Sequence, residues 1–202
     1  MSEITHSHTK KIVIIALLIA IEIILTRIAV IQIPPGAAIV RISLGFICIA
    51  IIAMLYGPVF SAIAAVIADV VGVMLLPTGG VFFPGFTISA LLIGIIYGLL
   101  LHKQPVPFWK VCVTAGIVTI GINFFIDTLW ISIIPHWGYI VSGDTSIDGE
   151  LFERVGTAYI ALIPVRIIRT AIMLPLQIVC IRFITGKRFA KILHLKREEG
   201  DL

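Results

Sequence analysis

Long apolar runs, each bounded by Pro, Gly or charged residues, are the feature that most constrains the fold of this chain. Only 13% of its 202 residues are charged and 59% are hydrophobic, whereas about a quarter of a soluble domain is charged. Six runs are candidates for helices that cross a bilayer: about residues 12–31, 43–56, 59–76, 86–101, 111–134 and 159–184. The sequence therefore predicts an all-α integral membrane protein, with residues 1–202 forming a single six-helix transmembrane bundle.

The basic residues outside these runs fall on one predicted side of the membrane. Lys10 and Lys11 precede the first run, Lys103 and Lys110 separate the fourth and fifth, and a basic tail beginning at Lys187 follows the sixth. Because Lys and Arg are enriched in cytoplasmic loops, both termini are predicted to be cytoplasmic in a multi-pass cell-membrane protein. The basic residues form no single patch, so nucleic acid is not a predicted partner. The outward connections are then residues 32–41, 77–85 and 135–158.

The sixth run carries two arginines well inside an apolar segment. Between residues 160 and 177 the sequence is IALIPVRIIRTAIMLPLQ, in which helical periodicity places Arg166 and Arg169 on one face with Thr170, Met173 and Gln177. An arginine at membrane depth costs several kcal/mol unless it pairs, snorkels to the headgroups or faces a watery cavity. The two arginines are therefore candidate ligand-binding residues, and snorkelling is the alternative.

Most other intramembrane charges lie in the predicted outer halves of the runs. Arg27, Arg41, Asp69 and Asp127 lie there with the two arginines, and Glu22 lies near mid-depth. This distribution predicts a polar cavity that opens outward and carries a small positive excess. With the N-terminal dipole of the sixth helix added, the cavity suits a carboxylate-bearing ligand. The alternative is that Asp127 only neutralises Arg166 or Arg169 across the bundle.

The fifth run offers groups that suit a heterocyclic ring. Thr119, Asn123, Asp127 and Trp130 share one helical stripe. A carboxylate and an amide can hydrogen-bond the donor–acceptor edge of a heterocycle while an indole stacks on its face.

The second outward connection, LLPTGGVFFPGF, adds glycine and aromatic residues. Gly80 lets the backbone approach a ligand closely, and Phe82, Phe83 and Phe86 offer faces for a flat ring. An aromatic belt at the membrane interface is the alternative. The third outward connection, 135–158, is long and acidic, which suits a lid or a solvated excursion.

Small residues recur one turn apart in three runs. Ala16 and Ala20 do so in the first run, and similar stripes occur in the third and fourth. Such faces let helices approach closely in lipid. Two of the stripes are predicted to be internal and one to be a docking surface.

Several functional motifs are missing from the sequence. It contains no GxxxxGK[ST], HExxH or GxSxG pattern, and its three cysteines are isolated in apolar runs. No metal, cofactor or nucleotide site is predicted, and the chain is not predicted to be an enzyme.

Three stretches resemble a known family, the substrate-binding S components of energy-coupling factor (ECF) vitamin transporters, and most of all its folate-specific members. They are ISLGFICIAIIAMLYGP at 42–58, ADVVGVMLLPTGGVFFPGFTISALLIGIIYGLL at 68–100 and LIPVRIIRTAIMLPLQ at 162–177. The resemblance implies a vitamin-binding subunit that works with a transmembrane coupling subunit and two cytoplasmic ATPases. Ala16 and Ala20 would contact the coupling subunit, and ATP hydrolysis would reorient the chain to release the ligand inward. The fifth run lies outside the resemblance.

Folate fits the predicted cavity, since its pterin edge suits Asn123 and Asp127 and its glutamate tail suits the arginines. Another vitamin, such as a thiamine precursor or pantothenate, is the nearest alternative. A small intramembrane enzyme using Asp69 or Asp127, and a structural membrane subunit whose charges merely pair, are alternatives of other classes.

Overall fold

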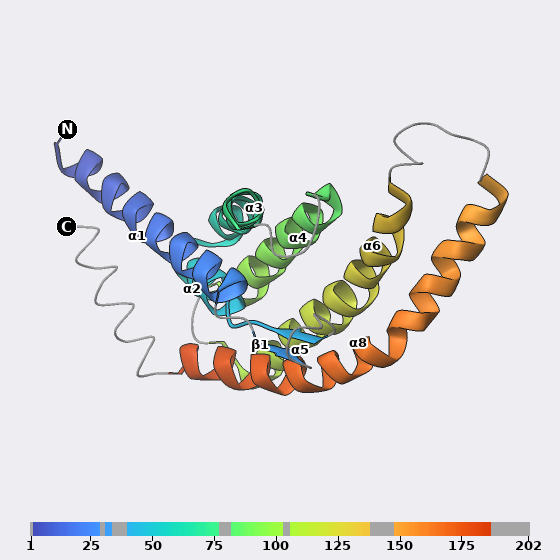
Figure 1. Cartoon of the computed structure of the whole chain (residues 1–202). Helices are drawn as coiled ribbons and strands as arrows, with labels where there is room; N and C mark the ends of the chain where they lie inside the picture. Colours follow the sequence, from blue (N-terminus) through green and yellow to red (C-terminus); the bar gives the residue numbers. More distant parts are fainter. Residues whose placement is uncertain are drawn as a thin grey trace.

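Helices dominate the computed structural model, which describes residues 2–28, 31–33, 40–76, 82–102, 106–137 and 148–186. The helical segments, shown in Figure 1, are α1 (Ser2–Arg27), α2 (Phe46–Tyr56), α3 (Pro58–Leu75), α4 (Pro84–Leu101), α5 (Phe108–Gly116), η1 (Ile117–Ile126), α6 (Asp127–Ile133), η2 (Ile134–His136) and α8 (Asp148–Ile184). Because α5, η1, α6 and η2 follow one another without a break, they form one rod. Counted this way, the helices agree with the six that the sequence predicts.

The connection predicted between residues 32 and 41 is not only a loop. It contains two short antiparallel strands, β1 (Ile31–Ile33) and β2 (Val40–Ile42), paired Ile31 with Ile42 and Ile33 with Val40. Both strands alternate a polar residue with β-branched ones, and a Pro-Pro-Gly turn signal lies between them in the sequence. The hairpin lies against α8 (Figure 1).

The sixth helix is longer than the apolar run that predicts it. α8 begins at Asp148 rather than near residue 159, so the second half of the predicted third loop is helical. Acidic residues such as Asp148 are favoured at the N-terminus of a helix by the macrodipole. Pro164 and Pro175 lie inside α8, where each removes a backbone hydrogen bond and bends the helix. Figure 1 shows the resulting curve, with one half of α8 beside α6 and the other nearer α5.

The fifth helical rod contains a π-helix at its centre. The ten residues of η1 lie between the α-helical segments α5 and α6, whereas the sequence predicts a uniform α-helix. π-Helical turns are rare and are frequent at functional sites. η1 carries Thr119 and Asn123, two of the residues predicted to face a ligand.

The closest packing joins α3 to α4. A Cβ atom on Gly98 would lie 2.1 Å from Cα of Pro58, and one on Gly94 would lie 2.6 Å from Cα of Ala62. The hydroxyl of Ser61 donates a hydrogen bond of 2.7 Å to the carbonyl of Gly94. Around this contact lies the main core, whose fully buried side chains include Ile52, Tyr97, Leu101, Val111, Val118 and Ile181.

Four of the described helical segments are long and apolar enough to cross a membrane: Pro58–Leu75, Pro84–Leu101, Phe108–His136 and Leu151–Ile184. Phe46–Tyr56 is a shorter apolar helix. Large apolar side chains such as Met74, Leu99 and Phe183 are exposed on these helices, which suits a lipid environment.

Candidate ligand-binding site

Arg166 and Arg169 lie one turn apart on α8, beside the fifth rod. Arg166 is only 8% exposed. Arg169 lines a narrow cavity of about 10 Å³ with Asn123, Thr119, Thr170 and Met173, which is room for about one water molecule. Two residues predicted from separate helices, Asn123 and Arg169, are therefore neighbours. A ligand larger than water requires α8 and η1 to separate at this point.

Asp127 lies at the junction of η1 and α6, within electrostatic reach of both arginines. Its polar neighbours include the hydroxyl of Ser89 and the guanidinium groups of Arg169 and Arg166. Among the described residues, its Oδ1 atom is buried without a hydrogen-bond partner and no ion pair involves Asp127. A buried carboxylate oxygen without a partner is costly, so this atom is suited to accept a hydrogen bond from a ligand.

The predicted stripe on the fifth rod faces the protein interior. Thr119 donates a buried hydrogen bond of 2.7 Å to Oε1 of Gln177 on α8. Nε1 of Trp130 donates one of 3.2 Å to the hydroxyl of Ser89 on α4. The stripe therefore contacts α4 at one end and α8 at the other, with Asn123 and Asp127 between these contacts.

An aromatic cluster lies next to Asp127, and Phe83 is at its centre. The ring of Phe83 lies 5.8 Å from that of Trp130, 4.8 Å from that of Trp137 and 6.0 Å from that of Phe86, measured between centroids. Phe83 is 6% exposed. Gly85 makes this cluster possible, because a Cβ atom there would lie 2.6 Å from Cδ2 of Trp130. Phe82, by contrast, is exposed and lies outside the cluster.

Arg27 and Asp69 form a second charge cluster, and the carboxylate of Asp69 is also within electrostatic reach of Asp127. Nη2 of Arg27 lies 3.4 Å from Oδ1 of Asp69, and the hydroxyl of Thr87 donates a bond of 2.9 Å to Oδ2 of Asp69. The pair thus joins α1, α3 and α4. Gly72 leaves room for it, since a Cβ atom there would lie 3.1 Å from Nε of Arg27. Glu22 lies near this cluster and its Oε2 atom is buried without a partner.

The charges predicted to line one outward cavity fall into two neighbouring clusters, which Asp69 and Asp127 bring within electrostatic reach of one another. Arg27, Asp69 and Glu22 belong to one, and Asp127, Arg166 and Arg169 to the other. The predicted helix dipole does not contribute to the second cluster. α8 begins at Asp148 and continues past both arginines, so its free N–H groups lie about four turns away.

Two predicted site residues cannot be placed against this geometry. Arg41 lies on β2 opposite Gln32, but its side chain lies outside the described residues, as does the whole of Gly80. Sequence reasoning also missed Gly85, Ser89 and Trp137. Gly85 and Ser89 are small residues one turn apart on α4. This spacing leaves room for a bulky side chain, and the ring of Trp130 lies there.

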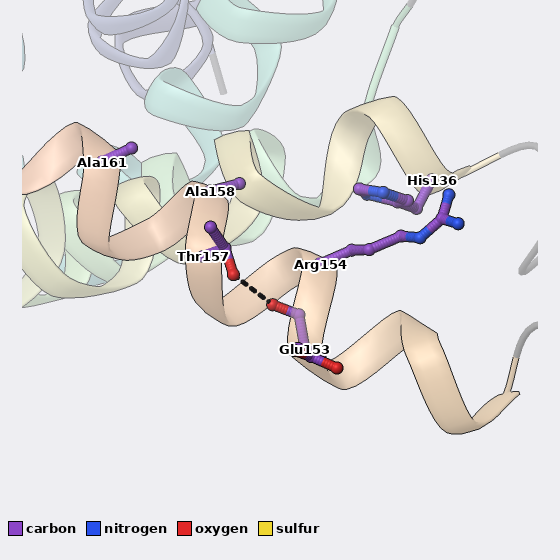
Figure 2. A pocket seen from close by; sticks show the side chains of 6 residues that line it. All are labelled: His136, Glu153, Arg154, Thr157, Ala158 and Ala161. Atoms are coloured by element: carbon purple, nitrogen blue, oxygen red, sulfur yellow. Dashed lines mark hydrogen bonds between the residues drawn. The ribbon is translucent and has the colours of Figure 1, made fainter.

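A larger pocket opens between the end of the fifth rod and the start of α8 (Figure 2). Its volume is about 580 Å³, and it is lined by His136, Glu153, Arg154, Thr157, Ala158 and Ala161. Figure 2 labels Arg154 on α8 and His136 on η2 among the side chains that line it. No pattern in the sequence predicts this pocket, because the sequence predicts a loop at Glu153 and Arg154, which instead lie in α8.

Ala16 and Ala20 lie on an exposed face of α1. The small residues of α3 and α4 are instead internal, as the contacts of Gly94 and Gly98 show. Of the three small-residue stripes, the one on α1 is therefore the one that the described residues leave exposed.

Comparison with known proteins places these features in a family. Residues 10–184 match the model of the family described as ECF transporter, substrate-specific component. A folate transporter FolT of Clostridium novyi (strain NT) is 32% identical over 166 residues, 82% of each chain. A folate transporter FolT of Leuconostoc mesenteroides subsp. mesenteroides is 30% identical over 171 residues, 84% of this chain and 81% of the relative.

A solved structure is similar as well. The crystal structure of FolT bound with folic acid matches with a TM-score of 0.64 and 30% sequence identity, covering 85% of this chain and 88% of the other. These relatives are transport proteins, which excludes the alternative of an intramembrane enzyme. The resemblance seen in the sequence is confirmed: the chain belongs to the ECF transporter family, as a substrate-specific membrane component.

Proposed function

We propose that this chain binds folate from outside the cell, as the substrate-binding subunit of an ATP-driven ECF importer. The observation that carries the proposal is the cluster of Asp127, Arg166 and Arg169 beside the Phe83–Trp130 aromatic pair. The match at 30% identity to FolT bound with folic acid supports folate as the ligand.

Each part of the cluster suits one part of folate. The partnerless Oδ1 of Asp127 can accept a hydrogen bond from the pterin edge. Asn123 can add an amide donor and acceptor, and the Trp130 ring can stack on the flat heterocycle. Arg166 and Arg169 can donate charge-assisted hydrogen bonds to the glutamate carboxylates.

Binding requires the cluster to open. The cavity at Asn123 and Arg169 holds only about 10 Å³, far less than a vitamin needs. Pro164 lies in α8 between the outer pocket and the arginines, and a proline inside a helix is a point of bending. Movement of α8 away from η1 at this bend admits the ligand.

The six helices form a transmembrane bundle with both termini in the cytoplasm, following the distribution of basic residues. Ala16 and Ala20 dock a transmembrane coupling subunit, which is joined by two cytoplasmic ATPases. Hydrolysis of ATP on those partners drives the reorientation that releases folate inward.

Direct binding tests the proposal. Folate added to the purified subunit is expected to quench the fluorescence of Trp130 and Trp137 and to bind with one-to-one stoichiometry. Pantothenate and a thiamine precursor serve as competitors in the same assay. Binding of either competitor in preference to folate would assign the subunit to another vitamin.

A further inference from the structure

We propose that the surface where α5 begins and α8 ends binds an anionic phospholipid, whose phosphate is held by Arg182 and Lys110. Four residues define this surface, here called the α5–α8 patch: Phe108, Trp109, Lys110 and Arg182. Contacts join the two helices (Figure 1). The inference goes beyond the proposed function, because it assigns a lipid to a surface that takes no part in binding folate.

Each cation of the α5–α8 patch lies over an aromatic ring. Nζ of Lys110 lies 5.8 Å from the centroid of the Trp109 ring, and Cζ of Arg182 lies 5.9 Å from that of the Phe108 ring. The second of these contacts crosses from α8 to α5. A cation–π contact holds a cation in place without neutralising its charge, so both groups stay able to attract an anion.

The positive charge of the patch is not balanced by acidic residues. In the part of the chain that the structure describes, neither Lys110 nor Arg182 forms an ion pair. The sequence contains no Asp or Glu at 103–126 or at 155–197. α4 and α2, which contact α5 and α8 respectively, contain none either. Charge complementarity therefore favours an anion as the occupant.

The patch lies at one end of two candidate membrane spans. Phe108 is the first residue of the span Phe108–His136, and Arg182 is two residues from the end of the span Leu151–Ile184. Trp109 is 61% exposed. Tryptophan is enriched at the level of the lipid headgroups, and long basic side chains extend to the same level. The cations of the patch therefore suit the depth of a lipid phosphate.

Exposed apolar side chains follow the patch on both helices. Val113 and Ile117 continue from Trp109 along the fifth rod, and Val179 and Ile172 precede Arg182 on α8. These side chains are large and branched, whereas a closely docked helix requires small residues at the contact. They suit the acyl chains of the same lipid whose phosphate the cations hold, so a phospholipid fits this surface better than a protein helix.

Native mass spectrometry of the whole subunit tests the inference, with phosphatidylglycerol as the anionic lipid and phosphatidylcholine as the zwitterionic one. The wild type is expected to retain phosphatidylglycerol in preference. Arg182→Gln and Lys110→Gln should each lower its retention about two- to fivefold, the effect of one basic residue near an anionic headgroup. Retention of phosphatidylcholine and the Tm should not change.

Lys10→Gln is the matched control, because Lys10 is exposed on α1 on the same predicted side of the membrane. It should leave the retention of phosphatidylglycerol unchanged. An equal loss in Lys10→Gln would show general attraction to anionic lipid and overturn the site, as would equal retention of the two lipids by the wild type. Neither result would affect the proposed binding of folate.

Fluorescence quenching places the lipid on the patch. In phosphatidylcholine nanodiscs, a minority of brominated phosphatidylglycerol should quench tryptophan fluorescence more than the same amount of brominated phosphatidylcholine. The excess should disappear in Trp109→Phe, and its survival there would place the lipid elsewhere and overturn the inference. Loss of co-purifying coupling subunit in Arg182→Gln, with unchanged phosphatidylglycerol retention, would assign the surface to a protein partner and also overturn it.

Discussion

The α3–α4 interface and the α6–α8 interface are both made by apolar helices, but they differ in how closely the helices approach. Between α3 and α4, Gly94 and Gly98 bring the backbones into contact beside Ala62 and Pro58. Between the end of α6 and the start of α8 lie a pocket of about 580 Å³ and the residues Glu153 and Arg154. The first interface is closely packed, whereas the second leaves a pocket.

The physical reason lies in the membrane environment. Lipid tails are as apolar as leucine, so helices associate in a bilayer through close packing and hydrogen bonds and not through the hydrophobic effect. The α3–α4 interface has both, including the bond from Ser61 to Gly94. The end of α6 and the start of α8 leave a pocket in place of this packing, and Pro164 further weakens α8. Under the proposed function, the ligand enters where close packing of small residues between helices is absent.

The largest expected effect comes from disrupting the α3–α4 interface. Gly98→Ala places a methyl group 2.1 Å from Cα of Pro58, and overpacking against backbone is expected to cost about 3 kcal/mol or more. Thermal unfolding in detergent should show a large fall in Tm or a loss of folded protein. Gly116→Ala is the control, because nothing lies within 4 Å of its Cβ position. Equal stability of the two variants would contradict a scaffold role for the α3–α4 contact.

The next largest effect is expected at the ligand. Arg166→Ala and Arg169→Ala should each weaken folate binding by about 1.5–3 kcal/mol, the value of a charge-assisted hydrogen bond, which is roughly ten- to a hundredfold in Kd. Lysine at either position should rescue only partly, because it lacks the planar two-pronged geometry.

Pteroate, which lacks the glutamate, sharpens this experiment. If the arginines hold the tail, pteroate should bind the wild type weakly and respond little to either substitution. Equal losses for folate and pteroate would place the arginines at the ring or in support of the fold through Asp127. No response from either ligand would favour pairing or snorkelling.

A smaller effect, on stability, is expected in the second charge cluster. Asp69→Asn keeps an oxygen for Thr87 but removes the ion pair with Arg27, and both partners are 17% exposed. We expect a loss of about 1 kcal/mol in the free energy of unfolding, with folate affinity nearly unchanged. A double-mutant cycle with Arg27→Met measures the pair directly. If Asp69→Asn weakens folate binding more than it lowers stability, the two clusters form one site.

The smallest effect on the subunit itself is expected on α1. Ala16→Leu and Ala20→Leu add volume to an exposed face, so Tm and folate affinity should stay within error of the wild type. Assembly with the coupling subunit should nevertheless fail, because close helix contact tolerates no added volume. Co-purification of the partner complex measures this, and normal assembly would show that the face contacts lipid.

The proposed orientation places the pocket between α6 and α8 on the outside of the membrane, and cysteine labelling tests this orientation independently of ligand binding. In a cysteine-free background, a cysteine at Ser146 should react with an impermeant reagent from outside, and one at Gln104 should not. The reverse labelling pattern would place the open pocket on the cytoplasmic side.

Local information in the sequence is sufficient to predict most of the helices of this protein and its candidate polar residues. The apolar runs predict the six helices, and Pro58 and Pro84 begin α3 and α4 as expected at a first helical turn. Arg166, Arg169, Asn123 and Asp127 are predicted as candidate site residues because polar groups inside apolar helices are rare and are a functional-site hypothesis by default. Helical periodicity also groups them correctly by face, since it depends only on neighbours along the chain.

Only the tertiary structure decides which of these groups meet. Arg27 pairs with Asp69 and Trp130 bonds to Ser89, contacts between residues 42 and 41 positions apart. The early start of α8 and the pocket at His136 and Arg154 likewise depend on how two distant helices end beside one another. The physical reason is that hydrophobicity and propensity act over a few residues, whereas the partner of a buried charge is chosen by the packing of the whole bundle.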